Sequence, residues 1–287
     1  MILNFLLALQ MFSPTDPATL RPLYEKAIAI RSTKYGDQSA EAAAAMGDYG
    51  RFLARSQDPT AAVQWLSRAV VISARLEDKQ ALAMALESID PLQAAALHEE
   101  VGTKTRGELA AVSWSRLGAM SEAQRSFMQS EKAYRAAIAS SANDEKLSIR
   151  LNELALLLKG QGNLRDAEPL LRRAVKIQQQ VLGAGSPELA ATLNNLSGLL
   201  LDTKRSAEAE PLARRALQIF EGTLGRGHVR TAIAASNLAD VLLAQGVNVQ
   251  AVKYYQQALA VFEKELGLDH AWTRDVRDAL AHSFQKD

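Results

Sequence analysis

Apolar residues recur along the chain at the three- and four-residue spacing of amphipathic helices, in two stripes separated by a short polar break. In the first stripe a bulky apolar residue precedes a small one, in Leu7-Ala8, Tyr49-Gly50, Leu117-Gly118, Leu154-Ala155, Leu196-Ser197 and Leu238-Ala239. An alanine stands in the second stripe 19 residues after each small residue, at Ala27, Ala69, Ala137, Ala174, Ala216 and Ala258. Small side chains at both positions let two helices approach closely, so the pattern predicts antiparallel helix pairs.

The helix pairs repeat with a period of 42 residues. The segment from Ala167 to Ala174 returns as the segment from Ala209 to Ala216, and Leu182-Gly183 returns as Leu224-Gly225 and again as Leu266-Gly267. A period of this length is typical of stacked helical units, in which each unit packs only on its neighbours. The sequence therefore predicts an all-α fold, a right-handed α-solenoid of antiparallel helix pairs.

The regularity of the period divides the chain into four parts. We predict two helix pairs over residues 1–76, a shorter degenerate pair over 77–110, which lacks the bulky-small dipeptide, and three pairs over 111–269. Residues 270–287 are expected to form a capping helix or a truncated repeat. The step from Ala137 to Ala174 is only 37 residues. We expect the solenoid to change its curvature there and in the degenerate pair.

The apolar segment 1–12 has two interpretations. Leu7-Ala8 places it in register with the repeat, which predicts the first repeat helix. The segment is apolar on all sides, as export signals are, but it lacks a basic start and a clear cleavage site. Twelve residues are too few to span a bilayer. We predict a cytoplasmic protein without a stable membrane span, with an exported or periplasmic location as the alternative if residues 1–12 act as a signal.

Charge and motif content argue against several classes of protein. The chain has 33 basic and 32 acidic residues and no cysteine. This balance does not favour a nucleic-acid partner, and disulfides and cysteine-bound metals are excluded. His98-Glu99-Glu100 lacks the second histidine of zinc proteases, and the glycines near Ser186 lack a phosphate-binding lysine. We predict no enzyme, no catalytic residue, no metal site and no cofactor.

Trp114, Leu117-Gly118, Tyr134 and Ala137 stand at the spacing of a known repeat, and on these residues the chain resembles the tetratricopeptide repeat family. The 42-residue period and the Leu-Gly-x-x-His motifs at 224–228 and 266–270 resemble the kinesin-light-chain type of that repeat. The resemblance implies a non-catalytic scaffold that binds a peptide or protein segment in its concave groove. Two alternatives remain: a sensor or regulatory component of a larger effector with a protease, kinase or nucleotide-binding partner domain, and an enzyme with a spatially assembled site.

Polar side chains on the first helices are the candidates for this groove. Asparagine offers both a donor and an acceptor, and the resemblance implies that Asn152 and Asn194 pair with the backbone of an extended peptide. The alternative is that the asparagines bond to neighbouring helices and hold the superhelical pitch, which is the favoured interpretation for Asn195 and Asn237. The predicted groove residues are Arg51, Arg55, Arg116, Asn152, Lys159, Asn194, Ser236 and Asp240.

The charges among these candidates differ along the chain. Arg51, Arg55, Arg116 and Lys159 are basic, whereas Asp240 and the nearby Asp202 are acidic. We expect the N-terminal half of the groove to accept acidic side chains or a carboxylate and the C-terminal half to tolerate basic ones. Charge complementarity of this kind contributes to partner selection more than to affinity.

Overall fold

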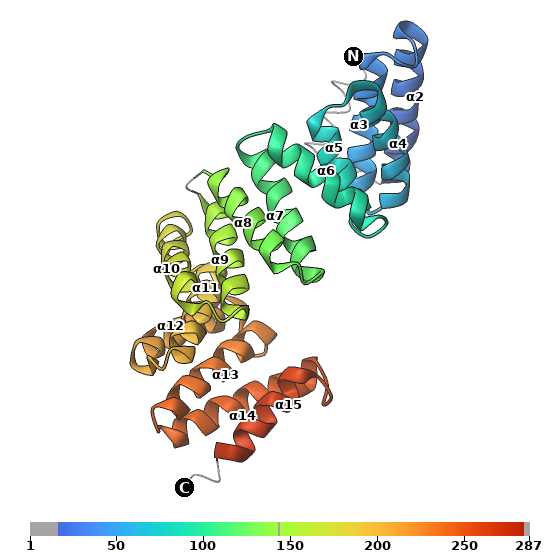
Figure 1. The fold of residues 1–287 in the computed structure, drawn as a ribbon. Helices are drawn as coiled ribbons and strands as arrows, with labels where there is room; N and C mark the ends of the chain where they lie inside the picture. Colours follow the sequence, from blue (N-terminus) through green and yellow to red (C-terminus); the bar gives the residue numbers. More distant parts are fainter. Residues whose placement is uncertain (1–16, 143, 284–287) are drawn as a thin grey trace. The chain divides into compact units, whose positions relative to one another are not determined.

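The structure is a computed structural model that describes residues 17–142 and 144–283, and within these residues all regular elements are α-helices (Figure 1). The segment 1–12, predicted as a helix or a signal, lies outside the described residues. The chain forms two compact units, unit 1 (Met1–Ser140) and unit 2 (Ser141–Asp287). The division between them falls inside the irregular 37-residue step between Ala137 and Ala174.

The helices follow one another with short connections. The helices of unit 1 are α2 (Pro17–Tyr35), α3 (Ala40–Arg55), α4 (Pro59–Ser73), α5 (Leu76–Leu86), α6 (Pro91–Lys104), α7 (Glu108–Ala123) and α8 (Phe127–Ala139). The helices of unit 2 are α9 (Glu145–Gly160), α10 (Leu164–Val181), α11 (Pro187–Asp202), α12 (Ser206–Leu224), α13 (Val229–Ala244), α14 (Asn248–Glu265) and α15 (Ala271–Ser283).

Successive helices form the predicted pairs, and within each unit a helix packs mainly on its neighbours in sequence. The pairs are α3 with α4, α5 with α6, α7 with α8, α9 with α10, α11 with α12, and α13 with α14. Helix α2 carries Ala27 at the position that the pattern assigns to a second helix. The pair α5 and α6, predicted as degenerate, has helices of only 11 and 14 residues. Helix α15 follows the last pair without a second helix after it among the described residues.

The prediction of three pairs over residues 111–269 is wrong, because four pairs lie between Glu108 and Glu265. The bulky-small dipeptides at Leu117, Leu154, Leu196 and Leu238 mark all four pairs, so the count of three did not follow from the pattern. The second helix of the pair α7 and α8 has 13 residues, whereas α10, α12 and α14 have 18 or 19. The short second helix removes this pair from the 42-residue period that the three later pairs share.

Small residues bring the two helices of a pair together, as the sequence pattern predicts. The second-helix alanines Ala69, Ala137, Ala174, Ala216 and Ala258 are fully buried. At Gly50, a Cβ atom would stand 2.5 Å from Cγ of Leu66 on the paired helix, and at Gly118 it would stand 2.9 Å from the ring of Tyr134. Any larger side chain at these glycines would push the paired helices apart.

A repeated capping position starts the first helices. Ser39, Asp144 and Ser186 each accept a hydrogen bond from the backbone N–H three residues later. At the equivalent positions of the next two repeats stand His228 and His270, whose Nδ1 atoms accept from the N–H of Arg230 and of Trp272. The two histidines accept hydrogen bonds from backbone N–H groups that have no partner within the first turn of a helix. A structural capping role therefore accounts for both histidines.

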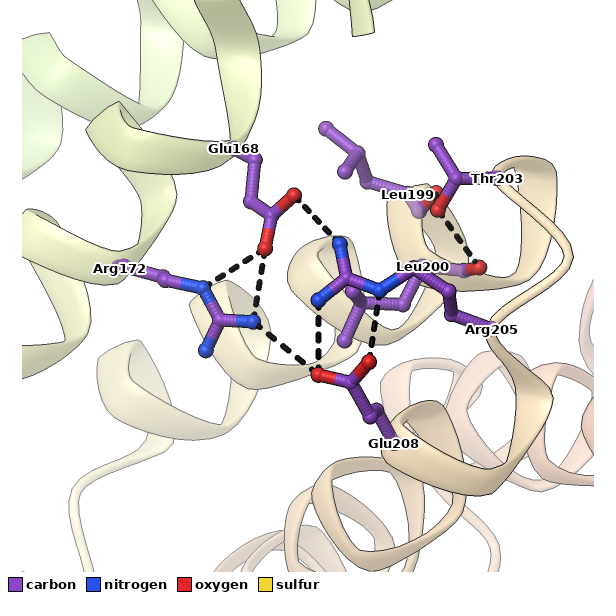
Figure 2. A network of polar contacts seen from close by, with 7 residues as sticks. All are labelled: Glu168, Arg172, Leu199, Leu200, Thr203, Arg205 and Glu208. Carbon is purple, nitrogen blue, oxygen red and sulfur yellow. Dashed lines mark hydrogen bonds and ion pairs between the residues drawn. The ribbon is translucent and has the colours of Figure 1, made fainter. Parts of the chain in front are cut away.

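An ion-pair network joins successive repeats in unit 2 (Figure 2). Glu168 and Arg172 of α10 face Arg205 and Glu208 at the start of α12. Arg205 contacts Glu168 at 2.7 Å and Glu208 at 2.7 Å, while Arg172 contacts Glu168 at 2.7 Å and Glu208 at 3.6 Å. Partial burial raises the pKa of the Glu168 carboxyl, but the hydrogen bonds and charges of the two arginines outweigh it and lower this pKa overall.

Unit 1 contains the same contact with the charges exchanged. Arg21 occupies the repeat position of Glu168, and Asp58 occupies that of Arg205. The two are joined at 2.8 Å, and both pairs are separated by 37 residues in sequence. The repeat fixes the place of this contact, and either order of the charges satisfies it.

Candidate peptide-binding groove

The first helices of unit 2 lie side by side and carry asparagines one repeat apart. Helix α11 contacts both α9 and α13. Asn195 donates from Nδ2 to Oδ1 of Asn152 at 2.9 Å, and Asn237 donates from Nδ2 to Oδ1 of Asn194 at 3.0 Å and to its backbone oxygen at 3.1 Å. Asn195 and Asn237 therefore bond to the neighbouring first helix, as the favoured interpretation of these two residues predicted.

These bonds orient the side chains of Asn152 and Asn194. The Oδ1 atom of each amide is held by the asparagine of the next helix. The Nδ2 group of each amide consequently points away from that bond, and both side chains are half-buried. Each of the two residues retains two N–H donors for another acceptor.

Two hollows open along this row of asparagines. The first has a volume of about 400 Å³ and is lined from α9, α10, α11, α12 and α13; its lining includes Asn152, Gln178, Asn194, Phe220, Arg230 and Ile233. The second has a volume of about 330 Å³ and is lined from α9, α11, α13, α14 and α15; its lining includes Lys159, Asn194, Ser236, Asp240, Trp272 and Asp275. Asn194, Asn195 and Ile233 line both hollows. We call the two hollows together the asparagine groove.

All five predicted residues of unit 2 line the asparagine groove. Asn152 lines the first hollow, Asn194 lines both, and Lys159, Ser236 and Asp240 line the second. Lys159 Nζ forms an ion pair with Asp202 Oδ2 at 3.0 Å, so its charge is balanced within the protein.

Asp240 is partly buried at the side of the second hollow. Its Oδ1 accepts a hydrogen bond from the hydroxyl of Tyr255 at 2.5 Å. Burial raises the pKa of Asp240 above its ordinary value of 3.8, and the Tyr255 hydroxyl opposes this rise by stabilising the carboxylate. The hydrogen bond also fixes the direction in which the carboxyl group faces.

The three predicted residues of unit 1 belong to α3 and α7. Arg51 forms ion pairs with Asp78, which is fully buried, and with Asp48 at 2.5 Å. Arg116 lies 3.4 Å from Glu87, which also contacts the fully buried His98 at 3.1 Å. Arg55 is exposed in the last turn of α3. Two of these three arginines are therefore held by carboxylates of unit 1, and the predicted preference of the N-terminal half for acidic partners stays a prediction.

Sequence reasoning missed several residues of the groove, of which Gln178, Trp272 and Asp275 differ most from their repeat equivalents. Gln178 is fully buried, and its Oε1 has no hydrogen-bond partner among the described residues. Phe220 and Phe262 stand at the same position of the next two repeats. Trp272 and Asp275 lie on α15, in the part predicted as a cap. An alignment of the repeats against one another would have singled out all three.

No helix in the described part of the chain combines the length and the apolar character that a membrane crossing needs. Across the same residues, no group of three or more histidine, aspartate or glutamate side chains has the arrangement of a metal site.

Comparison with known proteins identifies the repeat. Sequence profiles described as tetratricopeptide repeat match residues 21–76, 145–222 and 230–287, which is more than half of the chain. A search of curated proteins finds no match.

Solved structures with a similar fold include two to which the chain aligns with high coverage. The crystal structure of BtubC (BKLC) from P. vanneervenii is 21% identical with a TM-score of 0.56, covering 77% of this chain and 83% of that one. The APC/C hetero-tetramer Cut9-Hcn1 is 14% identical with a TM-score of 0.58. It covers 96% of this chain, which spans 50% of that chain's length. At these identities the likeness concerns the fold.

Proposed function

Because the chain belongs to the tetratricopeptide repeat family, whose stacked helix pairs form extended binding surfaces, we propose that unit 2 binds an extended segment of a partner protein in the asparagine groove. The protein acts in this proposal as a non-catalytic interaction scaffold. Micromolar affinity is the expected range for a short extended segment.

The observation that carries the proposal is the orientation of Asn152 and Asn194. Both amides are fixed in the same way, by an asparagine 43 residues further along the chain. They present N–H donors at equivalent places on adjacent first helices. An extended peptide offers backbone carbonyl oxygens along its length, and such a pair of donors can hold two of them whatever the side chains are.

The lining between the asparagines suits the rest of such a segment. The first hollow combines apolar side chains, among them Ile149 and Ile233, with the polar side chains of Glu188 and Arg230 at its edge. Ile149 is 43% exposed. Apolar contact with a peptide side chain would remove this surface from water and add to the backbone hydrogen bonds.

A selection experiment tests the proposal. The full chain is used to select binders from a displayed library of random short peptides, and the selected peptides are measured by fluorescence polarisation. The variant Asn152→Asp/Asn194→Asp keeps the oxygen that accepts from Asn195 and Asn237 but replaces both groove donors by acceptors. We expect its affinity for the selected peptides to fall about tenfold or more, since two hydrogen bonds are lost.

The control has to separate the loss of donors from the added negative charge. Gln218→Asp/Gln256→Asp adds the same charge at exposed positions of α12 and α14, away from the groove. This variant is expected to bind as the unmodified chain does. If the groove variant retained full affinity while its helical content and thermal unfolding were unchanged, the binding site would lie elsewhere and the proposal would be wrong.

A further inference from the structure

The two hollows of the asparagine groove are equivalent in the repeat but differ in chemistry. Phe220 contributes to the first hollow and Phe262 to the second, one repeat apart. At two other equivalent positions the residue type changes. Arg230 and Ile233 of the first hollow correspond to Trp272 and Asp275 of the second. Residues that the repeat fold requires stay the same from one repeat to the next, so the positions that change are those free to define a ligand.

The second hollow has an excess of negative charge. Its lining contains the carboxyl groups of Asp240 and Asp275 and a single basic side chain, that of Lys159. Lys159 is already paired with Asp202 outside the lining. The side chain of Asp275 is exposed and has no hydrogen bond or ion pair with any described residue. The hollow therefore offers two carboxyl groups that no basic side chain of the described protein balances.

An aromatic ring completes the second hollow. Trp272 is 45% exposed and lines it from α15. Its ring packs against Phe262 at a centroid distance of 6.0 Å and edge-on against His270 at 5.2 Å. Its backbone N–H donates to Nδ1 of the same histidine. The indole is thus held in place on one side and open to solvent on another.

We propose that the second hollow of the asparagine groove recognises a basic side chain, arginine or lysine, of the bound segment. The inference rests on the proposed function and names the chemistry of the partner. The cation lies against the ring of Trp272 and contacts the carboxylate of Asp275, with Asp240 adding to the negative potential. A cation over an exposed indole and an ion pair at its edge are each worth a few-fold in affinity. Arginine has the advantage of a planar group that stacks on the ring and donates to the carboxylate at once.

The first hollow provides the contrast. Its equivalent of Asp275 is Ile233, and its equivalent of Trp272 is Arg230, an exposed cation that would repel a basic side chain. Glu188 also lines that hollow, so a basic residue is not excluded by charge alone. Specificity between the two hollows therefore comes from Trp272 and Asp275.

The test uses two small probes that differ in charge and not in shape. N-acetyl-arginine amide and its neutral isostere N-acetyl-citrulline amide are titrated into the full, ¹⁵N-labelled chain, and the indole N–H signal of Trp272 is followed by NMR. Substitution of Trp65 and of Trp114 by phenylalanine assigns the three indole signals. We expect the Trp272 signal to shift with the arginine probe and several-fold less with citrulline. Asp275→Asn should weaken the arginine response about two- to fivefold.

The control variant is Asp278→Asn, which removes an exposed carboxylate of the same helix that does not line the hollow. It is expected to leave the response unchanged. Equal responses to arginine and citrulline, or an Asp275→Asn variant that responds like the unmodified chain, would overturn the inference.

Peptide selection separates this inference from the proposed function. Peptides that require Asn152 and Asn194 but carry no basic residue at a fixed position would support the groove as a binding site and reject the basic subsite. If no peptide required the asparagines while the probe titration still gave the charge-dependent shift of Trp272, the proposed function would fail and the basic subsite would stand.

Discussion

Asn195 and Asn152 stand 43 residues apart in sequence and are joined by a hydrogen bond of 2.9 Å from Nδ2 of the first to Oδ1 of the second. Asn237 and Asn194 repeat the same bond one repeat later. The two bonds tie α9, α11 and α13 together and orient the side chains that face the groove. Asparagine thus joins neighbouring helices at Asn195 and Asn237. In our proposal it binds the partner segment at Asn152 and Asn194.

The bond between Asn195 and Asn152 should be measurable as stability. We expect Asn195→Ala to lower the free energy of unfolding by about 1 kcal/mol, because a half-buried hydrogen bond is lost. Urea denaturation followed by circular dichroism gives the change. Asn195→Ala should also weaken peptide binding, since Asn152 is no longer oriented. A variant of undiminished stability would show that the bond does not hold in solution.

Gln178 is a polar residue at a position that phenylalanine occupies in the next two repeats. Its Oε1 is buried without a partner, which costs free energy in the folded state. We therefore expect Gln178→Phe to raise the free energy of unfolding by about 1 kcal/mol. The reciprocal control, Phe220→Gln, should lower it by about 3 kcal/mol through lost apolar burial and an added unsatisfied group. A lower free energy of unfolding for Gln178→Phe would contradict this prediction and would indicate that the space around Gln178 cannot hold the phenylalanine ring.

The exchanged charges of Glu168–Arg205 and Arg21–Asp58 predict that the contact depends on complementarity and not on the order of the charges. Arg205→Glu should lower the thermal unfolding temperature, because it places a third carboxylate beside Glu168 and Glu208. Adding Glu168→Arg should restore part of that loss. The fall in unfolding temperature and its partial recovery should both be smaller at high salt, because salt screens exposed charges. Calorimetry at low and high salt measures this, and a double variant no more stable than Arg205→Glu would contradict the prediction.

Asp240 should titrate above its ordinary pKa of 3.8, because burial disfavours its carboxylate. Since the folded-state pKa lies above the unfolded one, the stability linked to this group is fully present below the unfolded pKa and is lost as the pH rises through the folded pKa. Tyr255→Phe removes the hydroxyl that stabilises the carboxylate, so the pKa of Asp240 should rise further. A ¹³C NMR titration of the Asp240 carboxyl carbon tests the direction, and an unchanged or lower pKa in this variant would disprove it.

The repeat pattern predicted most of the helix pairing, for a definable reason. Ala174, Ala216 and Ala258 are fully buried where the helices of a pair meet. The contact joins residues close in sequence and recurs in every repeat. It is therefore visible in a single sequence as a repeated spacing of small residues. The pair α7 and α8 carries the same pattern, in Leu117-Gly118 and Ala137, although its second helix is shorter than those of the later pairs. The short helices α5 and α6 lie in the part of the sequence that lacks the bulky-small dipeptide.

The groove residues were predictable only in part. Asn152, Lys159, Asn194, Ser236 and Asp240 line the two hollows because the register of the first helices places them there. That they bind a peptide stays a prediction. Trp272 and Asp275 were not predicted, because α15 was interpreted as a cap and its place beside Asp240 depends on how the last helix packs.

The sequence by itself determined the fold class, the helix register and the face of each helix that is buried, because these follow from local spacing and side-chain size. Only the tertiary structure decided which polar groups meet: that Asn195 holds Asn152, that Lys159 is paired with Asp202, and that Trp272 joins two carboxyl groups in one hollow. The physical reason is that these contacts join different helices, and their distances depend on how the repeats stack.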